Sequence, residues 1–557
     1  MTSWMPRSAV VCACAVLAAA GALAEPASAQ QSRAGTAAQS AASPIAGTIV
    51  VAMPQFPALP IPTLMEGAAA HTANFDLADQ LFLRLATPGP SLATAGDRGF
   101  EPGLAQRWTR RDSLTLVFDL DPRARWHDGV PVTAKDVVFA FTRARDPQIS
   151  PRLARPLRWV RDVSAEGERR VIVRFTRAYA EQLFDATFHV HPLPAHLLAS
   201  LAPGGVAGSP FAAAPVGNGP YRWVRAVPGQ TVELAANPAF HLGRPGIGRV
   251  IFRIATSPDA RLNMLLSGEA DALDNVIPPL ANLERIAARP ELRLVPTPSP
   301  SVGYFLFNQR DRADRTRPHP ILGDVNVRRA LVLALDRQSM ARAAYGPYAE
   351  VPAGPMSQLL WIRHLAGRAP AANPAEARRL LAASGWRDAD GDGTLEKDGR
   401  PLALGVQLPS TSLLRRQMAV QAQEQLRRIG VRLDVVTLDG PVWIQRRNAG
   451  DFDIDFSSAS QDPTPSGLLQ SWSCAGIGGS NVAGYCSPRT DSLINAAIVS
   501  RADPSPLWRE AIRQIAADAP AAFLYAPTAV YAVHRRFEGV RIRPESGWRD
   551  LWRWSVR

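Results

Sequence analysis

The stretch of residues 388–396 concentrates carboxylates that could hold a cation. Acidic residues stand at its first, third and fifth positions, Asp388, Asp390 and Asp392, and a glycine stands at its sixth. This spacing matches the start of a calcium-binding loop, in which alternate carboxylates turn toward one ion. The twelfth position of such a loop needs a bidentate glutamate, but here it is Gly399. The stretch therefore predicts an acidic β-turn or a weak calcium site, and a complete EF-hand is excluded.

Three histidines lie close together in the sequence, His189, His191 and His196. His189 and His191 would share one face of a strand, which is a spacing that can bind a metal. No cluster of carboxylates or cysteines stands nearby to complete the ligand set, so we expect no metal there.

The sequence lacks the common signatures of a catalytic nucleophile or a nucleotide site. It contains no G-x-S-x-G elbow, no H-E-x-x-H helix and no P-loop. A Ser-His-Asp triad has no fixed spacing, so a secreted hydrolase stays open as an alternative. We expect a protein that is not an enzyme and needs no cofactor.

The N-terminus predicts an export signal. Arg7 supplies a positive start, residues 9–24 are apolar and small, and residues 27–29 offer a small-x-small cleavage site ending at Ala29. The apolar run is shorter than the roughly 20 residues that span a bilayer. We therefore expect residues 1–29 to be a cleaved signal peptide, residues 30–46 to be disordered, and the mature protein to be soluble.

The mature chain keeps two of its four cysteines, Cys474 and Cys486, and both lie in one Gly-rich stretch. In an oxidising compartment, two cysteines so close in sequence most simply form a disulfide. The formal net charge of +13 could suggest nucleic acid, but the arginines are spread along the whole chain. We expect a solvated basic surface and no nucleic-acid partner.

With 557 residues the chain is too long for one ordinary hydrophobic core, so two or more lobes must position these groups. Its second half alternates helix and strand, which is typical of an α/β lobe. We expect strands at 47–51, 115–120, 171–175, 249–254 and 431–436. We expect helices at 137–143, 261–266, 324–335, 375–383 and 415–428.

One long segment resembles a known family. Residues 104–108, 118–120 and 126–138 are similar to the signature of the bacterial extracellular solute-binding proteins of family 5, the dipeptide- and oligopeptide-binding group of ABC transporters. Further matching segments follow in the same order: residues 191–196, 217–221, 237–240, 265–271, 307–308, 327–330, 336–337 and 382–386.

The resemblance implies a two-lobed α/β periplasmic-binding-protein fold of the type II, cluster C-like kind, with the ligand enclosed in a cleft between the lobes. By that analogy lobe I comprises residues 47–257, lobe II residues 258–526, and residues 527–557 return to lobe I. Two strands would cross between the lobes near residues 255–258 and 525–528. The implied function is to bind a peptide or peptide-like solute and deliver it to an inner-membrane ABC permease. The alternative is a secreted enzyme or a peptide-sensing receptor component with the same fold.

The resemblance also implies where the ligand binds. In peptide-binding relatives, extended backbone corresponding to Phe456 and Ser457 pairs with the main chain of the peptide. An aspartate commonly follows to hold the ligand ammonium, and Ala459 stands at that position here, with Asp462 as the alternative carboxylate. We therefore expect ligands whose amine is blocked, absent or displaced. The expected ligand-binding residues are Phe456, Ser457, Ser458, Ala459, Ser460, Asp462 and Asn308.

Overall fold

The computed structural model describes residues 45–66, 72–276, 279–500 and 502–557. Residues from Pro44 onward form one compact unit, and the unit is described here by itself. The predicted signal peptide, with Cys12 and Cys14, and almost all of segment 30–46 lie outside the described residues. Within the described residues, no helix combines the length and the apolar character that crossing a bilayer requires.

Twelve strands form the largest sheet in the described part of the chain, in the order β18-β17-β19-β13-β20-β11-β1-β10-β9-β8, with β12 and β14 also paired to β20. Their bounds are β1 (Thr48–Met53), β8 (Tyr221–Val227), β9 (Thr231–Ala236), β10 (Arg249–Ile254), β11 (Ala272–Leu273), β12 (Leu292–Pro298), β13 (Ser301–Phe307), β14 (Ala349–Glu350), β17 (Ala403–Pro409), β18 (Arg432–Leu438), β19 (Ile454–Ser460) and β20 (Ala521–His534).

A second sheet has the order β4-β5-β7-β6 and is antiparallel throughout. Its strands are β4 (Ala105–Asp112), β5 (Thr115–Leu120), β6 (Val160–Glu166) and β7 (Arg170–Phe175). Three short pairs complete the strands of the described residues: β2 (Ala86–Pro88) with β3 (Phe100–Pro102), β15 (Glu396–Lys397) with β16 (Arg400–Pro401), and β21 (Phe537–Glu538) with β22 (Ser555–Val556).

Helices connect and cover the strands. They are α1 (Thr72–Leu81), α2 (Ala134–Arg145), α3 (Pro151–Ala154), α4 (Gln182–Thr187), α5 (Ala195–Leu198), α6 (Pro210–Ala213), α7 (Pro258–Leu266), α8 (Leu280–Ala287), α9 (Val325–Ala334), α10 (Arg337–Tyr345), α11 (Pro374–Ala383), α12 (Leu413–Arg427), α13 (Gly440–Ala449), α14 (Leu468–Ser471), α15 (Pro488–Val499) and α16 (Ser505–Asp518). Short 3-10 turns include η1 (Pro62–Leu64), η3 (Pro156–Trp159), η5 (Trp361–Ala366) and η6 (Pro465–Gly467).

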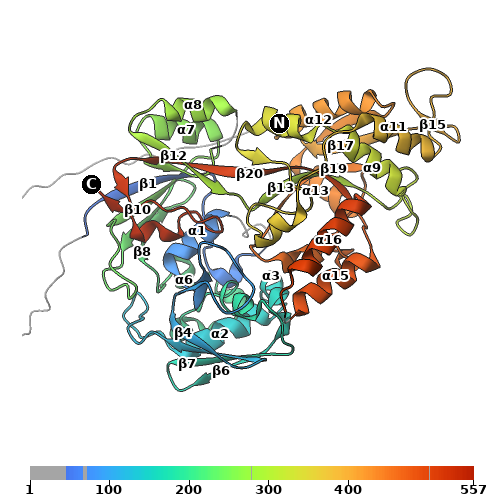
Figure 1. The fold of residues 1–557 in the computed structure, drawn as a ribbon. Helices are drawn as coiled ribbons and strands as arrows, with labels where there is room; N and C mark the ends of the chain where they lie inside the picture. The colour runs from blue at the N-terminus through green and yellow to red at the C-terminus, as the bar shows by residue number, and fades with distance from the viewer. Residues whose placement is uncertain (1–44, 67–71, 277–278, 501) are drawn as a thin grey trace, which may run out of the picture. The chain divides into compact units, whose positions relative to one another are not determined.

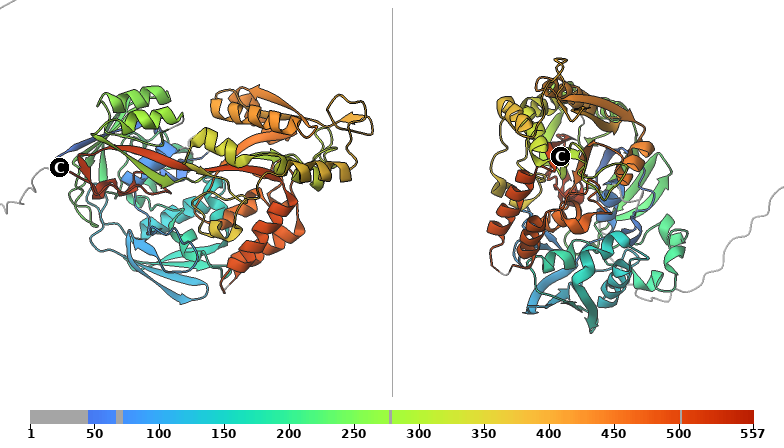
Figure 2. Two further views of the ribbon diagram at one scale, coloured as in Figure 1. Left: turned by 45° about the horizontal axis from the view of Figure 1, so that its top comes forward. Right: turned by 90° about the vertical axis from the view of Figure 1, so that its right-hand side faces the viewer.

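Strand β20 connects two regions of the large sheet. Its first residues pair with β13, from Leu306 opposite Ala521 to Gly303 opposite Tyr525, and its last seven pair with β12, from Pro298 opposite Thr528 to Leu292 opposite His534. Figure 1 shows β20 in red passing from the green β12 toward β13 and β19, and the left view of Figure 2 shows the same course. Because β12 and β13 are consecutive in the chain, the segment 292–307 runs antiparallel beside β20 and forms a second connection between the same two regions.

The buried apolar side chains of the described residues form four clusters. The first gathers residues from 49–252, Ala272 and residues of the C-terminal segment, while the second and third lie within residues 302–525. The fourth joins Ala52 of β1 to apolar side chains between Leu262 and Leu292 and to Val530 and Ala532 of β20.

The fourth cluster bears on the expected lobe boundaries. The expectation assigns residues 258–292 to lobe II, but β11 pairs with β1 and β12 pairs with the last half of β20. Packing therefore groups these residues with the expected lobe I, and it favours a crossing at Ser299 and Pro300, between β12 and β13, over one at 255–258. The second expected crossing, 525–528, lies on β20. The lobe boundaries remain a prediction.

The observed elements follow the sequence pattern closely where local signals are strong. The strands expected at 115–120 and 249–254 are β5 and β10, and each of the five expected helices overlaps an observed one. Helix α2 begins at a capping box, in which the Asp136 carboxylate accepts from the backbone N–H of Thr133 at 2.8 Å. Asp324 caps α9 by accepting from the backbone N–H of Asn326.

Candidate functional site

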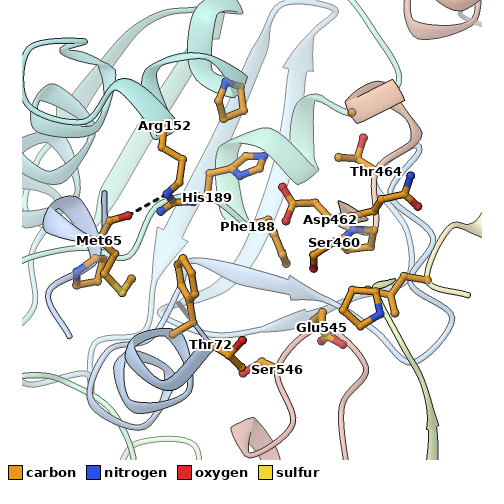
Figure 3. A pocket seen from close by; sticks show the side chains of 18 of the residues that line it. Met65, Thr72, Arg152, Phe188, His189, Ser460, Asp462, Thr464, Glu545 and Ser546 are labelled. Carbon is orange, nitrogen blue, oxygen red and sulfur yellow. Dashed lines mark hydrogen bonds between the residues drawn. The ribbon is translucent and has the colours of Figure 1, made fainter. Parts of the chain in front are cut away.

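A cavity of about 840 Å³ lies among segments that are far apart in the sequence. Helix α1 and Arg84 contribute one part of its wall, and the α3–η3 segment and residues 188–191 contribute a second. Residues 460–470 and residues 544–547 close it from two further sides (Figure 3). The cavity thus lies between residues of the expected lobe I and residues of the expected lobe II.

The carboxylate of Asp79 in the cavity wall has two partners within the protein, Arg84 and His191. The Asp79 carboxylate lies 3.3 Å from Nη1 of Arg84 and 3.0 Å from Nε2 of His191, and all three side chains are buried. Burial alone would raise the pKa of Asp79, but the Arg84 charge and the His191 hydrogen bond outweigh it and hold that pKa below its usual range. Burial, together with the Arg84 charge, lowers the pKa of His191 to about 4. At neutral pH His191 is therefore uncharged and donates to Asp79 through Nε2.

The arginines of the α3–η3 segment form a basic part of the wall. Arg152 donates from Nε to the carbonyl oxygen of Met65 at 3.1 Å and lies over the ring of Phe75 at 5.1 Å (Figure 3). Arg158 lies 4.2 Å over the ring of Trp159. Stacking holds these guanidinium groups in place while part of each stays exposed. They offer charge-assisted donors to a ligand carboxylate or carbonyl group.

Strand β19 supplies the opposite side of the site. It is fully paired with β13, but it pairs with β17 only at Ile454 and Asp455. Beyond Asp455, no described strand pairs with the second edge of β19. Such an open edge can accept an extended ligand main chain.

A second cavity of about 290 Å³ lies along the end of β19. Ser458, Ala459 and Ser460 line it, and the two cavities share Ser460, Gln461, Asp462, Thr464, Gly467 and Gln470. Because they share these residues, the two cavities adjoin at the end of β19.

The structure places the expected ligand-binding residues in two groups. Ser458, Ala459, Ser460 and Asp462 line at least one of the two cavities. The remaining three, Phe456, Ser457 and Asn308, line neither.

The second group is held by the protein itself. Phe456 packs against Phe305 in the core, with ring centroids 4.7 Å apart. The hydroxyl of Ser457 donates to the buried Asp455 carboxylate. Asn308 donates to the carbonyl oxygens of Gly450 and Phe452 at 3.0 and 2.7 Å. These contacts occupy the side chains of Phe456 and Ser457, and they favour a structural role for Asn308.

Comparison with known proteins identifies the family. The family model for bacterial extracellular solute-binding proteins, family 5, matches residues 99–479. The chain belongs to this family.

Individual relatives agree with that assignment. The oligopeptide-binding protein AppA of Bacillus subtilis is 25% identical over 450 residues, which cover 79% of this chain and 80% of AppA. The structure of that AppA in complex with a nonapeptide aligns over 92% of this chain and 99% of its own, with a TM-score of 0.74 at 24% identity. NikZ from Campylobacter jejuni in complex with Ni(L-His) aligns with a TM-score of 0.74 at 22% identity, over 91% and 99% of the two chains. The two-lobed α/β periplasmic-binding fold expected from the sequence is thereby confirmed.

The family signature proves to be structural in this chain. His127 accepts the backbone N–H of Gly217 at Nδ1, 3.1 Å, so its Nε2 carries the proton and donates to the Gly219 carbonyl oxygen at 3.1 Å. Gly217 packs so tightly that a Cβ atom there would lie 1.9 Å from the carbonyl oxygen of Leu81. The motif residues therefore join the 126–131 loop, residues 217–219 and the end of α1 into one unit.

The three histidines of the metal hypothesis face three different carboxylates. His191 contacts Asp79, His196 contacts Asp128 at 2.8 Å, and His189 lies 3.5 Å from Asp185. Each imidazole thus has its own acidic partner, an arrangement that does not converge on one ion.

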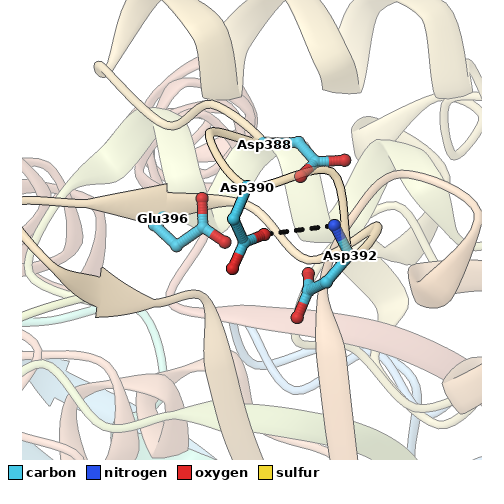
Figure 4. Close-up of side chains that lie close together, drawn as sticks. All are labelled: Asp388, Asp390, Asp392 and Glu396. Atoms are coloured by element: carbon cyan, nitrogen blue, oxygen red, sulfur yellow. Dashed lines mark hydrogen bonds between the residues drawn. The ribbon is translucent and has the colours of Figure 1, made fainter.

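The acidic segment 388–396 forms a tight turn outside both cavities (Figure 4). Asp388, Asp390, Asp392 and Glu396 can bring one carboxylate oxygen each within 4.8 Å of one another. Each carboxylate accepts backbone N–H groups of the same turn, as Asp390 does from Asp392 at 3.1 Å. The turn therefore has its own internal hydrogen bonds, and calcium binding by it stays a hypothesis.

Most of the cavity wall contributed by the expected lobe I was not anticipated from the sequence. Asp76, Arg84, Arg152 and Glu545 lie outside every motif discussed above. Their only local signal is the pair of carboxylates Asp76 and Asp79 on a short helix. The long-range contacts that bring them together leave no trace in composition or spacing.

Proposed function

We propose that this protein is an exported solute-binding component of an ABC importer that encloses a peptide or peptide-like solute between two lobes and delivers it to a membrane permease. The observation that carries the proposal is the cavity of about 840 Å³ together with the adjoining cavity of about 290 Å³, which Ser458, Ala459 and Ser460 of the unpaired end of β19 line. Main-chain pairing at such an edge does not depend on side-chain identity, so it suits ligands of varied sequence. The nonapeptide bound to AppA supports the same ligand class.

The same proposal extends to location and partner. Members of the family are extracellular or periplasmic binding proteins, which agrees with the predicted signal cleavage near Ala29. We propose that the mature protein is a periplasmic monomer and that its permease contacts both closed lobes. Cleavage is checked by N-terminal sequencing of the exported protein, and the oligomeric state by light scattering.

The binding reaction itself requires no covalent chemistry. The family consists of binding proteins rather than enzymes. A secreted hydrolase with this fold is the competing function, and it predicts turnover of a peptide that the protein binds. Incubating the purified protein with such a peptide and following both by mass spectrometry separates the two: an unchanged peptide supports binding, and cleavage products support the enzyme.

Closure of the lobes is the expected response to a ligand. With the segment 292–307 and β20 as the two connections, the lobes can rotate about Ser299–Pro300 and residues 526–528. Closure removes water from the site and strengthens each polar contact with the ligand.

The decisive experiment begins with the protein as purified. Native mass spectrometry identifies any solute held in the site. Calorimetry with di- to pentapeptides then gives affinities, and X-ray scattering gives the radius of gyration with and without ligand. We expect a peptide-like ligand and a smaller radius at saturation; absence of any bound solute and of any peptide affinity would contradict the proposal.

A further inference from the structure

Several polar groups at one end of the large cavity have no hydrogen-bond partner. The Asp76 side chain on α1 is 4% exposed, and no described residue donates to its carboxyl oxygens. Oε1 of Glu545 forms ion pairs with Nε of Arg543 at 3.0 Å and with Nη1 of Arg549 at 3.3 Å. Oε2 of Glu545 is buried and has no hydrogen-bond partner among the described residues. The buried hydroxyl of Ser546 also lacks a partner. Asp76, Glu545 and Ser546 all line the same cavity, and Figure 3 shows Glu545 and Ser546 beside each other there.

Tyr531 connects the two acidic side chains. Its ring lines the cavity, and a Cβ atom on Gly547 would lie 2.4 Å from its hydroxyl oxygen, so it packs directly on the 545–547 segment. Burial first, and then the charges of Asp76, Asp274 and Glu545, raise the pKa of Tyr531. Gln80 Nε2 donates to the backbone carbonyl oxygens of Asp76 at 3.4 Å and Trp548 at 2.9 Å, so α1 at Asp76 lies beside the segment that carries Glu545 and Ser546.

Charge balance shows which group is missing. Asp79 is neutralised by Arg84 and His191, and Glu545 is neutralised by Arg543 and Arg549. The charged groups that act on Asp76 are Asp274 and Asp79, both of them carboxylates, so after burial itself they raise its pKa further. Burying an ionised carboxylate without a positive partner is unfavourable, so these surroundings favour the protonated form of Asp76. A positive group beside Asp76 would favour its ionised form.

We propose that Asp76, Glu545 Oε2 and Ser546 form an acceptor subsite for a cationic N–H group of the ligand, an ammonium or a guanidinium. The inference rests on the proposed function, since it concerns the same cavity. A cation with several N–H donors can satisfy three acceptors at once, and its charge favours the ionised form of Asp76, which a neutral ligand group does not do. The subsite also gives the ligand a place for positive charge away from Ala459. The favoured ligands are thus peptide-like solutes with a basic side chain or an amine far from the usual N-terminal position.

The test uses two matched peptides whose amine is blocked. They are N-acetyl-Ala-Ala-Arg-Ala and the same peptide with citrulline, which has the shape of arginine without its charge. Calorimetry on the purified protein is expected to show the arginine peptide binding about 30-fold more tightly, the usual scale for a buried, hydrogen-bonded charge pair. Asp76→Asn should remove that difference, and Ser546→Ala should reduce it. Asp434→Asn is the control, because Asp434 is an exposed carboxylate outside both cavities. Asp462→Asn tests the competing carboxylate of the same cavity.

The outcomes separate this inference from the proposed function. Equal affinity of the two peptides for the wild-type protein, or a difference that survives Asp76→Asn, overturns the cation subsite and leaves peptide binding intact. A difference lost in Asp462→Asn but kept in Asp76→Asn also overturns it. If neither peptide binds, native mass spectrometry decides: a bound solute without an amine or guanidine overturns the subsite, and no bound solute contradicts the proposed function as well. Thermal melting of each variant verifies that it is folded.

Discussion

The carboxylate of Glu181 accepts a hydrogen bond from the hydroxyl of Thr464 at 2.6 Å, although 283 residues separate them in the sequence. Glu181 is 5% exposed and accepts two more hydroxyls, from Thr94 at 2.5 Å and from Ser466. Thr94 and Glu181 belong to the expected lobe I, and Thr464 and Ser466 to the expected lobe II. One buried carboxylate therefore holds the 464–466 segment, which lines the large cavity, against residues of the expected lobe I.

Removing this carboxylate should weaken ligand binding. Glu181→Ala leaves three hydroxyls without their acceptor, and each lost buried hydrogen bond costs about 1 kcal/mol. If the contacts form only in the closed state, affinity for a bound peptide should fall about tenfold or more, and the liganded radius of gyration should increase. Calorimetry and X-ray scattering measure both.

The matched control for Glu181 is Glu168→Ala, which changes an exposed glutamate of the same expected lobe. Thr464→Val is a second, milder variant that removes one donor and keeps the side-chain volume. Affinity and radius that match the wild-type protein in Glu181→Ala would show that these contacts exist in the open state too.

His127 should make the protein sensitive to acid. Burial first lowers the pKa of His127 from 6.5 to about 4 in the folded state. Between those two values the unfolded chain binds a proton that the folded protein does not, so stability falls as the pH drops from about 6.5 to about 4. At 1.36 kcal/mol per pKa unit the loss reaches about 3 kcal/mol. Urea unfolding at a series of pH values measures it.

The variant His127→Gln tests the assignment. It should be less stable at pH 7, because the acceptor for the Gly217 N–H is lost, but its stability should change less between pH 6.5 and 4. His364→Gln, at an exposed histidine, is the control and should keep the wild-type pH dependence. An unchanged pH dependence in His127→Gln would assign the acid sensitivity to other groups, such as His191.

The disulfide Cys474–Cys486, expected from the sequence, is confirmed in the structure. The two cysteines are 12 positions apart. The loop that they close contains Ser480 and begins two residues after Trp472, and both of these residues line the second cavity. In the chain-entropy model, closing so short a loop stabilises the protein by about 3 kcal/mol. The double variant Cys474→Ser, Cys486→Ser should lose about that much in urea unfolding. Titration of two free thiols in the folded wild-type protein would contradict the pairing.

Local signals in the sequence account for what could be predicted. Thr133 and Asp324 cap the helices expected at 137–143 and 324–335, and the disulfide joins the two cysteines expected to pair. Each of these signals acts over a few positions of the sequence. The family signature identified the fold through residues such as His127 and Gly217, whose contacts are structural.

The ligand site could be predicted only on the side where the family pattern runs along β19. Ser458, Ala459 and Ser460 do line a cavity, but the opposite wall is assembled from contacts over hundreds of residues. Asp76 and Glu545 line one cavity only because the chain returns to α1 after β20, and Glu181 meets Thr464 only through long-range packing. No periodicity or spacing in the sequence indicates such long-range pairs. The sequence therefore does not identify Arg84 and Asp76 as cavity residues, while it does suggest Asn308, which lines neither cavity.

Ala459 sits where a carboxylate is expected from the family resemblance. In the structure it pairs with Val302 on β13, is half-buried and lines the second cavity. The hydroxyls of Ser458 and Ser460 flank it, and Ser458 Oγ already accepts from Arg415 at 2.6 Å. A ligand ammonium placed here would lose its hydration without gaining a negative partner, which costs several kcal/mol.

Ala459→Asp should therefore reverse the preference among peptides. For the wild-type protein, N-acetylated tetrapeptides should bind at least as tightly as the same peptides with a free amine. In Ala459→Asp the free-amine series should bind about 30-fold more tightly than the acetylated one, because a desolvated ion pair now forms. Ala459→Asn, which adds similar volume without charge, should show no such gain. The wild-type protein could instead prefer free amines and lose that preference in Asp462→Asn. This outcome would show that Asp462 supplies the negative charge and that the absence of a carboxylate at position 459 does not affect selectivity.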